Sequence, residues 1–288
     1  MPQALPTIHL NDELVARDAA AISPFDRGFL YGDGVYEMIA CHAGRLFRLD
    51  DHLARLERSL AEVRMQNPHD RAAWRALLGE LIRANGNGDM NVYVQVTRGM
   101  KPERDHRFPA DTRPTVFAMC QPAGSVTAQM LEDGLAVITQ EDIRWARCDV
   151  KSTSLIANVL LRQMAEDAGA HETLLVRDGV ALEFSASTIF VVKDGRVFTT
   201  PNGNSILPGV TGIVVREAAA AAGIPVEEKR LPVALVKAAD EIWLASTTRD
   251  VMPVTRLDGE PAGGGRAGPV WRRVYDAFQA IKNEQVTS

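Results

Sequence analysis

The second half of the chain alternates short apolar runs with helical patterns, and this alternation limits the folds open to it. Residues 135–139, 172–177 and 241–245 are apolar runs of strand length. Between them, apolar residues recur at helical spacing over about residues 154–168 and 211–222. Such alternation of strands and helices is typical of an α/β arrangement.

The first half mixes the two kinds of element in another order, as in an α+β domain. Alternating apolar residues predict strands, and apolar residues at helical spacing predict amphipathic helices. The predicted strands cover residues 8–14, 45–49, 92–96 and 115–120, and the predicted helices cover residues 51–65 and 70–84.

A linker divides the two halves. Residues 121–129 contain Pro122, Gly124 and Ser125, which favour irregular structure. We therefore predict a smaller N-terminal α+β domain over residues 1–120. A larger C-terminal domain over residues 130–288 would end in an amphipathic helix over residues 270–281.

The composition excludes several classes of protein. The chain is 46% hydrophobic and 24% charged with a formal net charge of −5, and it has no dense Lys/Arg block, which argues against nucleic acid or a membrane as partner. The N-terminus lacks the features of a secretion signal, and no apolar run has the length of a spanning helix. Three irregularly spaced cysteines favour reduced thiols and a cytoplasmic location. The six histidines form no metal-binding motif, so we expect no metal.

One lysine occupies an unusual position. Lys151 lies in the stretch CDVKSTS (residues 148–154), between a predicted strand and a predicted helix. A desolvated lysine loses its proton more easily and can form a Schiff base with a carbonyl group. An exposed lysine at a strand-to-helix junction fits the same pattern and is the commoner case. The assignment therefore depends on what the rest of the chain offers.

Groups that suit an aldehyde cofactor with a phosphate, such as pyridoxal phosphate, occur elsewhere in the chain. Small residues at 209–212 open a helix, whose exposed N–H groups and dipole favour an anion. Arg55 and Thr248 could add to this phosphate site, and Glu183 could pair with a ring nitrogen. A plain helix cap near residue 210 and a solvated Arg55 are the simpler alternatives.

Two loops are also candidates for function. Residues 26–37 hold three glycines within seven residues, which indicates backbone with positive φ or in close contact with another group. Residues 100–109 hold three basic residues and a histidine, which would suit a carboxylate or phosphate. A tight loop before a strand and a charged surface loop are the respective alternatives.

Taken together, these stretches resemble the fold-type IV pyridoxal-phosphate enzymes, and most closely the D-amino-acid aminotransferases among them. The matching segments run in family order over nearly the whole chain: residues 26–28, 32–37, 52–56, 96–99, 142–145, 148–152, 207–211 and 246–248. Within the family, Arg104 and His106 look like the R-x-H carboxylate trap of the D-specific members. The resemblance implies a two-domain fold whose larger domain is a pseudo-barrel of strands and helices.

The resemblance also implies a role for each matched residue. Lys151 would form the Schiff base with the cofactor and move the substrate proton. Glu183 would pair with the ring nitrogen. Tyr36, Arg104 and His106 would bind the substrate α-carboxylate across the interface of a homodimer. The remaining cofactor contacts would come from Arg55, Leu207, Val210, Thr211 and Thr248.

Three positions depart from the family pattern. Phe184 follows the expected glutamate, Thr188 replaces an asparagine, and Gly212 replaces an arginine after the phosphate-binding threonine. We expect transamination of D-amino acids such as D-alanine with 2-oxoglutarate or pyruvate. An L-branched-chain aminotransferase, an (R)-amine transaminase and an aminodeoxychorismate-lyase-like enzyme are the alternatives on the same fold. A binding protein without cofactor chemistry is the non-enzymatic alternative.

Overall fold

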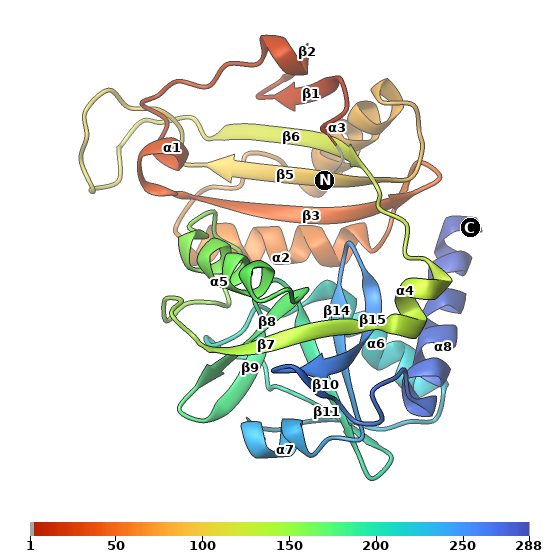
Figure 1. Cartoon of the computed structure of the whole chain (residues 1–288). Coiled ribbons are helices and arrows are strands. Elements are labelled where there is room, and N and C mark those ends of the chain that lie inside the picture. The colour runs from red at the N-terminus through yellow and green to blue at the C-terminus, as the bar shows by residue number, and fades with distance from the viewer. Residues whose placement is uncertain (1–2, 288) are drawn as a thin grey trace. The chain divides into compact units, whose positions relative to one another are not determined.

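The computed structural model describes residues 3–287, which fold as two compact units (Figure 1). The N-terminal unit runs to Gly124 and also includes Val150–Leu155. The C-terminal unit consists of Ser125–Asp149 and the chain from Ile156 onward. The predicted domains assign Lys151 to the second half, whereas the structure groups it with the N-terminal unit. The reason is backbone pairing, because Ser152 forms a β-bridge with Val35.

The N-terminal unit is built on a six-stranded sheet with the order β2-β1-β6-β5-β3-β4, in which all pairs are antiparallel. Its longest pairing joins β3 to β5 over eight residue pairs, from Gly34↔Thr97 to Cys41↔Met90. The strands are β1 (Thr7–Leu10), β2 (Glu13–Ala16), β3 (Gly34–His42), β4 (Arg45–Leu46), β5 (Met90–Thr97) and β6 (Thr115–Pro122).

Helices cover one face of this sheet. The apolar stripes of α2 (Leu49–Glu62) and α3 (Arg71–Ala84) pack on alternate residues of β3, β5 and β6, as the helical spacing predicted. Two strand predictions need correction. The run over residues 8–14 is a hairpin of β1 and β2, which turns at Asn11 with φ 58°. The run over residues 45–49 is a strand only at Arg45–Leu46, because α2 already begins at Leu49.

The alternation of side chains along β3 separates two residues that matter below. Glu37 is buried on the helix-covered face, in step with Val35, Ile39 and Cys41. Its neighbour Tyr36 lies on the opposite face, where its ring contacts Tyr93 of β5. The two faces of one strand therefore carry a buried carboxylate and a half-buried phenol.

The C-terminal unit is built on a ten-stranded mixed sheet. Its order is β12-β11-β10-β14-β15-β7-β8-β9-β13, with β16 paired to β15. Pairs β7–β8, β7–β15 and β11–β12 are parallel, and the others are antiparallel. The strands are β7 (Leu135–Glu141), β8 (Glu172–Arg177), β9 (Val180–Phe184), β10 (Thr188–Lys193), β11 (Arg196–Thr199), β12 (Val226–Glu228), β13 (Leu231–Pro232), β14 (Glu241–Ser246), β15 (Asp250–Leu257) and β16 (Glu260–Pro261).

The helices of this unit pack against the sheet and against one another. The alanine-rich α6 (Val210–Ala221) lies against α8 (Pro269–Thr287) and β14, and α5 (Ile156–Asp167) covers β7 and β8. These three helices begin and end within a few residues of the predicted positions, except that α8 continues to Thr287, beyond the predicted end at residue 281. Two short helices, α4 (Ala128–Asp133) and α7 (Val233–Lys237), complete the unit.

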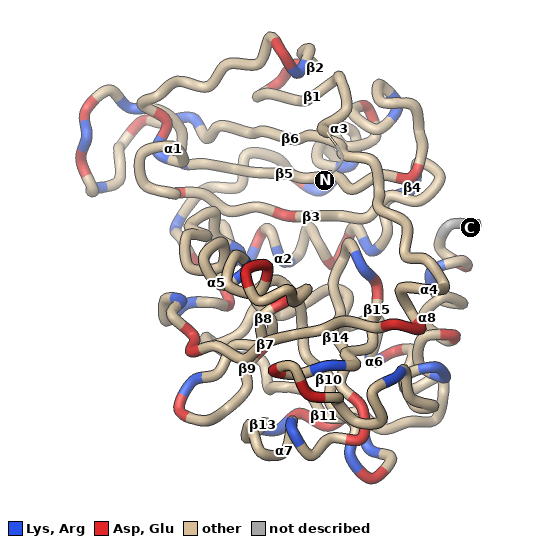
Figure 2. Tube along the Cα trace, in the orientation of Figure 1, with Lys and Arg blue, Asp and Glu red and all other residues tan. Residues whose placement is uncertain are grey.

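Charges of both signs are spread along the loops of each unit (Figure 2). The loop between β5 and β6 carries basic and acidic residues side by side, as its sequence implies. Within residues 3–287, no helix is long and apolar enough to cross a membrane. The same part of the chain contains no group of three or more His, Cys, Asp or Glu side chains arranged to hold a metal ion.

Candidate active site

The glycine-rich stretch at residues 26–37 folds into a short helix followed by the start of β3. Asp26 caps α1 (Arg27–Tyr31) by accepting a hydrogen bond from the Gly28 N–H, and Gly32 ends the helix with φ +66°. A Cβ atom at Gly28 would lie 2.3 Å from Thr97 Cγ2. Both predicted reasons for these glycines, positive φ and close approach, are therefore confirmed.

Lys151 is held against β3 through its backbone. The Tyr36 N–H donates to the Lys151 carbonyl at 2.9 Å, and the Lys151 N–H donates to Ser59 Oγ at 3.3 Å. The side chain is half-buried, and its Nζ atom lies 4.2 Å from the centroid of the Tyr36 ring. No carboxylate within residues 3–287 forms an ion pair with this amine. The amine therefore lies beside Tyr36, a predicted substrate-binding residue.

Arg55 of α2 is oriented by Glu37. Its Nε atom donates to Glu37 Oε1 at 2.8 Å and its Nη2 atom to Oε2 at 2.7 Å, a bidentate pair in which both side chains are buried. His52 Nδ1 lies 2.8 Å from the same carboxylate. Burial opposes ionisation, but Arg55 and His52 hold the pKa of Glu37 below its ordinary range. The predicted phosphate-binding arginine is thus fixed in a buried network.

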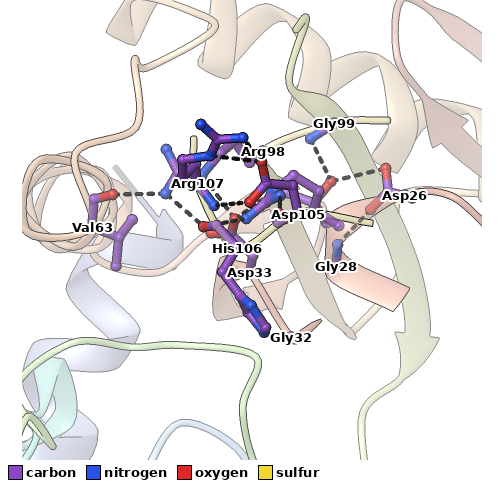
Figure 3. A network of polar contacts seen from close by, with 12 residues as sticks. Asp26, Gly28, Gly32, Asp33, Val63, Arg98, Gly99, Asp105, His106 and Arg107 are labelled. Carbon is purple, nitrogen blue, oxygen red and sulfur yellow. Dashed lines mark hydrogen bonds and ion pairs between the residues drawn. The ribbon is translucent and has the colours of Figure 1, made fainter. Parts of the chain in front are cut away.

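The predicted carboxylate-binding residues form two groups. Arg104 and His106 lie at Tyr31, with the His106 and Tyr31 ring centroids 5.3 Å apart and Arg104 Cζ 5.4 Å from the Tyr31 centroid. No hydrogen bond or ring contact joins either residue to Tyr36 within residues 3–287. A buried cluster around Asp33 holds the loop that carries Arg104 and His106 (Figure 3).

Glu183, near the end of β9, is paired with Arg144, for which the sequence predicts no role. Arg144 Nη1 donates to Glu183 Oε1 at 2.5 Å, and the Leu207 N–H donates to Oε1 at 3.1 Å and Oε2 at 3.3 Å. Burial raises the pKa of Glu183 to about 7, against the opposing effect of Arg144. Because Oε2 accepts only the longer contact among the described residues, it can still accept from a further donor such as a ring nitrogen.

Arg144 is itself anchored by a second carboxylate. Its Nε atom donates to Asp142 Oδ1 at 2.9 Å, and Arg177 Nη2 donates to Asp142 Oδ2 at 2.8 Å. Although burial opposes it, the two arginines lower the pKa of Asp142. The spacing Asp142-x-Arg144 is the signal that could have pointed to this arrangement, since residues two apart can share a turn.

The start of α6 fits a phosphate group. Gly209 is the N-cap, and no side chain of the described residues caps the helix, so the first N–H groups at Val210 and Thr211 are left for another acceptor. A Cβ atom at Gly209 would lie 2.4 Å from Thr188 Oγ1, so the close approach requires glycine. Thr248 lies in the turn after β14, two residues beyond the strand-end residue Ser246, whose buried Oγ atom has no hydrogen-bond partner within residues 3–287.

The three departures from the family pattern have separate structural settings. Phe184 is fully buried in the core. Thr188 begins β10 and faces the start of α6, where Gly212 would place a Cβ atom 3.7 Å from it. The predicted site residues come from both units. The C-terminal unit contains Glu183, Leu207, Val210 and Thr211, and the N-terminal unit contains Tyr36, Arg55, Arg104, His106 and Lys151.

Comparison with known proteins gives one consistent family. The family described as Amino-transferase class IV matches residues 34–257. The D-alanine aminotransferase of Bacillus licheniformis is 38% identical over 269 residues, covering 93% of this chain and 94% of that protein. The D-alanine aminotransferase of Listeria innocua is 36% identical over 271 residues, which is 93% of each protein.

Solved structures share the whole fold. The branched-chain amino acid aminotransferase of Escherichia coli superposes with a TM-score of 0.90 at 26% identity, over 96% of this chain and 94% of that chain. The T.th. branched-chain amino acid aminotransferase, solved with pyridoxamine 5'-phosphate, also has a TM-score of 0.90, at 25% identity over 98% of this chain and 95% of that one. These likenesses confirm the predicted fold class.

Proposed function

The chain belongs to the class IV aminotransferases, and on that premise we propose that it transfers the amino group of D-amino acids, such as D-alanine, to a 2-oxo acid such as 2-oxoglutarate or pyruvate. The observation that carries the proposal is the pairing of Lys151 with Tyr36 on β3, joined by the Tyr36 N–H to Lys151 carbonyl bond of 2.9 Å. The D-alanine aminotransferases at 36% and 38% identity support the choice of substrate.

We assign pyridoxal 5'-phosphate as the cofactor, which when bound supplies an aldehyde for the amine and a ring that accepts the electrons of the broken Cα–H bond. The residues of the chain fit such a group. Lys151 offers an amine without an acidic partner among the described residues, and Glu183 offers an oxygen with room for one more donor. Leu207 would pack on the ring, and the phosphate would be bound by Arg55, Val210, Thr211 and Thr248.

Lys151 also acts on the substrate in this proposal. With cofactor and amino acid bound, Lys151 Nζ would be the base that takes the proton from the substrate Cα and the acid that gives it back. Glu183 would accept from the ring nitrogen, and Arg144 favours the charged form of this buried carboxylate. Tyr36, Arg104 and His106 bind the substrate α-carboxylate.

We propose a homodimer, and the separation of the carboxylate-binding residues supports it. Since Arg104 and His106 do not contact Tyr36 within residues 3–287, we infer that they complete the site of a second copy. An apolar stripe on α5 supports such an assembly: Ile156, Val159, Leu160 and Met164 are 73%, 60%, 49% and 44% exposed. We further propose a cytoplasmic location, which suits the three free, buried cysteines.

The test of this function is a substrate screen. Purified enzyme with added pyridoxal phosphate is assayed with D- and L-amino acids against 2-oxoglutarate and pyruvate, following 2-oxo acid release. We expect D-alanine to be used far better than L-leucine, and Lys151→Ala to abolish turnover while Lys193→Ala, on the surface, leaves it intact. Preference for L-leucine would instead support a branched-chain enzyme, as the solved structural relatives suggest.

A further inference from the structure

The loop that carries Arg104 and His106 has little regular structure of its own. It joins β5, which ends at Thr97, to β6, which begins at Thr115. Near its start, Met100 forms a β-bridge with Asp26, and the Arg27 N–H donates to the Gly99 carbonyl at 2.9 Å. Ordering such a segment costs conformational entropy at every residue, so a loop that binds substrate needs contacts that hold it.

Asp33 is the centre of a buried cluster beside this loop (Figure 3). Its Oδ2 atom accepts from Arg27 Nε and Arg98 Nε, each at 2.8 Å, and its Oδ1 atom accepts from Arg98 Nη2 at 3.0 Å. The side chains of Arg27, Arg98 and Asp33 are 6%, 8% and 14% exposed. Burial alone would raise the pKa of Asp33, but its hydrogen bonds and ion pairs with Arg98 and Arg27 lower that pKa below its ordinary value.

Arg27 uses its remaining nitrogen atoms on the loop. Nη1 donates to the Asp105 carbonyl at 2.6 Å, and Nη2 lies 3.4 Å from the His106 carbonyl. Its guanidinium also lies over the Tyr31 ring, with Cζ 4.7 Å from the centroid. The same ring contacts His106 and Arg104, so Arg27 supports both the backbone and the aromatic surface beneath these two side chains.

Arg98 holds the same cluster from the other side. Its Nη2 and Nη1 atoms donate to the carbonyls of Val63 at 2.8 Å and Arg64 at 3.1 Å, where α2 has ended. Its Cζ atom lies 3.8 Å from the centroid of Phe108, further along the loop. The loop is therefore fastened at residues 105–106 by Arg27 and at residue 108 by Arg98.

We propose that Arg27 is a positioning residue for substrate recognition: anchored on Asp33, it holds the carbonyls of Asp105 and His106 and thereby sets the geometry in which Arg104 and His106 bind the substrate carboxylate. This inference rests on the proposed function, because it assumes that Arg104 and His106 meet a carboxylate. Arginine suits the role, since its planar fork donates to the carboxylate and to the two carbonyls at once.

The test compares two changes in the holoenzyme. Arg27→Lys keeps the positive charge beside Asp33 but cannot serve the carboxylate and both carbonyls together. We expect KM for D-alanine and for the 2-oxo acid to rise on the order of tenfold each, with kcat and the affinity for pyridoxal phosphate little changed. Arg107→Ala is the matched control: this arginine of the same loop is 89% exposed, and its ion pair is with Asp105. It should leave both KM values unchanged.

A second measurement separates positioning from general stability. Hydrogen exchange of the amides at residues 102–109 should be faster in Arg27→Lys than in the wild type, while exchange in β3 and β5 stays the same. Phe108→Ala, a change at a 49% exposed side chain, should loosen the loop and raise KM to a smaller extent. Unchanged KM values and unchanged loop exchange in Arg27→Lys, in an enzyme whose wild type is active, would overturn the proposal. A wild type without D-alanine activity would contradict the proposed function instead.

Discussion

Arg144 Nη1 lies 2.5 Å from Glu183 Oε1, and both side chains are buried in the C-terminal unit. A buried carboxyl on its own would be neutral at physiological pH, because desolvation disfavours its charged form. The guanidinium counteracts that effect and leaves the pKa of Glu183 at about 7. The carboxyl thus titrates within the range where small changes around it alter its charge.

Arg144→Met should therefore depress turnover without unfolding the unit. Removing the guanidinium raises the pKa of Glu183 further, so that more of the carboxyl is protonated and cannot accept from a ring nitrogen. We expect kcat to fall about ten- to a hundredfold, as for loss of a charge-assisted hydrogen bond. The pH at which kcat is half-maximal should shift upward.

Arg147→Met is the control, because Arg147 donates hydrogen bonds to Asp149 in the same loop. A kcat equal to that of the wild type would remove Arg144 from the site.

Arg104→Ala should raise KM for D-alanine by about one to two orders of magnitude, because a charge-assisted contact with the substrate is lost. If Arg104 serves the site of a second copy, mixing can restore function. An equimolar mixture of Arg104→Ala and Lys151→Ala should regain, at low D-alanine, up to about a quarter of the wild-type activity, since about half of the exchanged dimers are heterodimers and one of their two sites is intact. Mixtures whose activity at low D-alanine does not rise after subunit exchange would show that Arg104 acts within its own chain.

The elements of the fold follow largely from local patterns, whereas the partners at the site do not. Helices α2, α3, α5 and α6 lie within a few residues of their predicted bounds, because each buries an apolar stripe. The alternating pattern predicts one strand over residues 8–14, whereas the Asn-Asp turn divides this segment into a hairpin.

The charged partners depend on contacts that no local pattern encodes. Glu37 and Arg55 are 18 residues apart, and Arg144 and Glu183 are 39 apart. The residue types were visible in the sequence, but their pairing arises only when β3 meets α2 and when residues 142–144 meet β9. For the same reason the grouping of Lys151 with the N-terminal unit follows from its β-bridge neighbour and not from its place along the chain.

Gly209→Ala should weaken cofactor binding, because a Cβ atom there would lie 2.4 Å from Thr188 Oγ1. Relief of the clash would move the start of α6 away from Thr188 and displace the first N–H groups of the helix. We expect the Kd for pyridoxal phosphate to rise about tenfold, roughly the loss of one good hydrogen bond. Adding Thr188→Ala in the same chain removes the clashing atom and should restore most of the affinity. Equal losses in the single and double variants would mean that the clash is not the cause.

Asp33→Asn should remove part of the acid sensitivity of the protein. The pKa of Asp33 lies below its ordinary value of 3.8, so the native state binds fewer protons there than the unfolded state. The stabilisation is therefore complete above that ordinary value and is lost as the pH falls through the lowered pKa of the folded state.

At pH 7 the change leaves Arg27 and Arg98 buried without their shared carboxylate, which should lower the free energy of unfolding by about 3 kcal/mol. Urea unfolding at a series of pH values should show this gap between variant and wild type narrowing as the pH falls below 3.8. Asp18→Asn, at an exposed pair with Arg17, should leave the curve unchanged. A gap of constant size over the whole pH range would contradict an ionised Asp33 at the centre of the cluster.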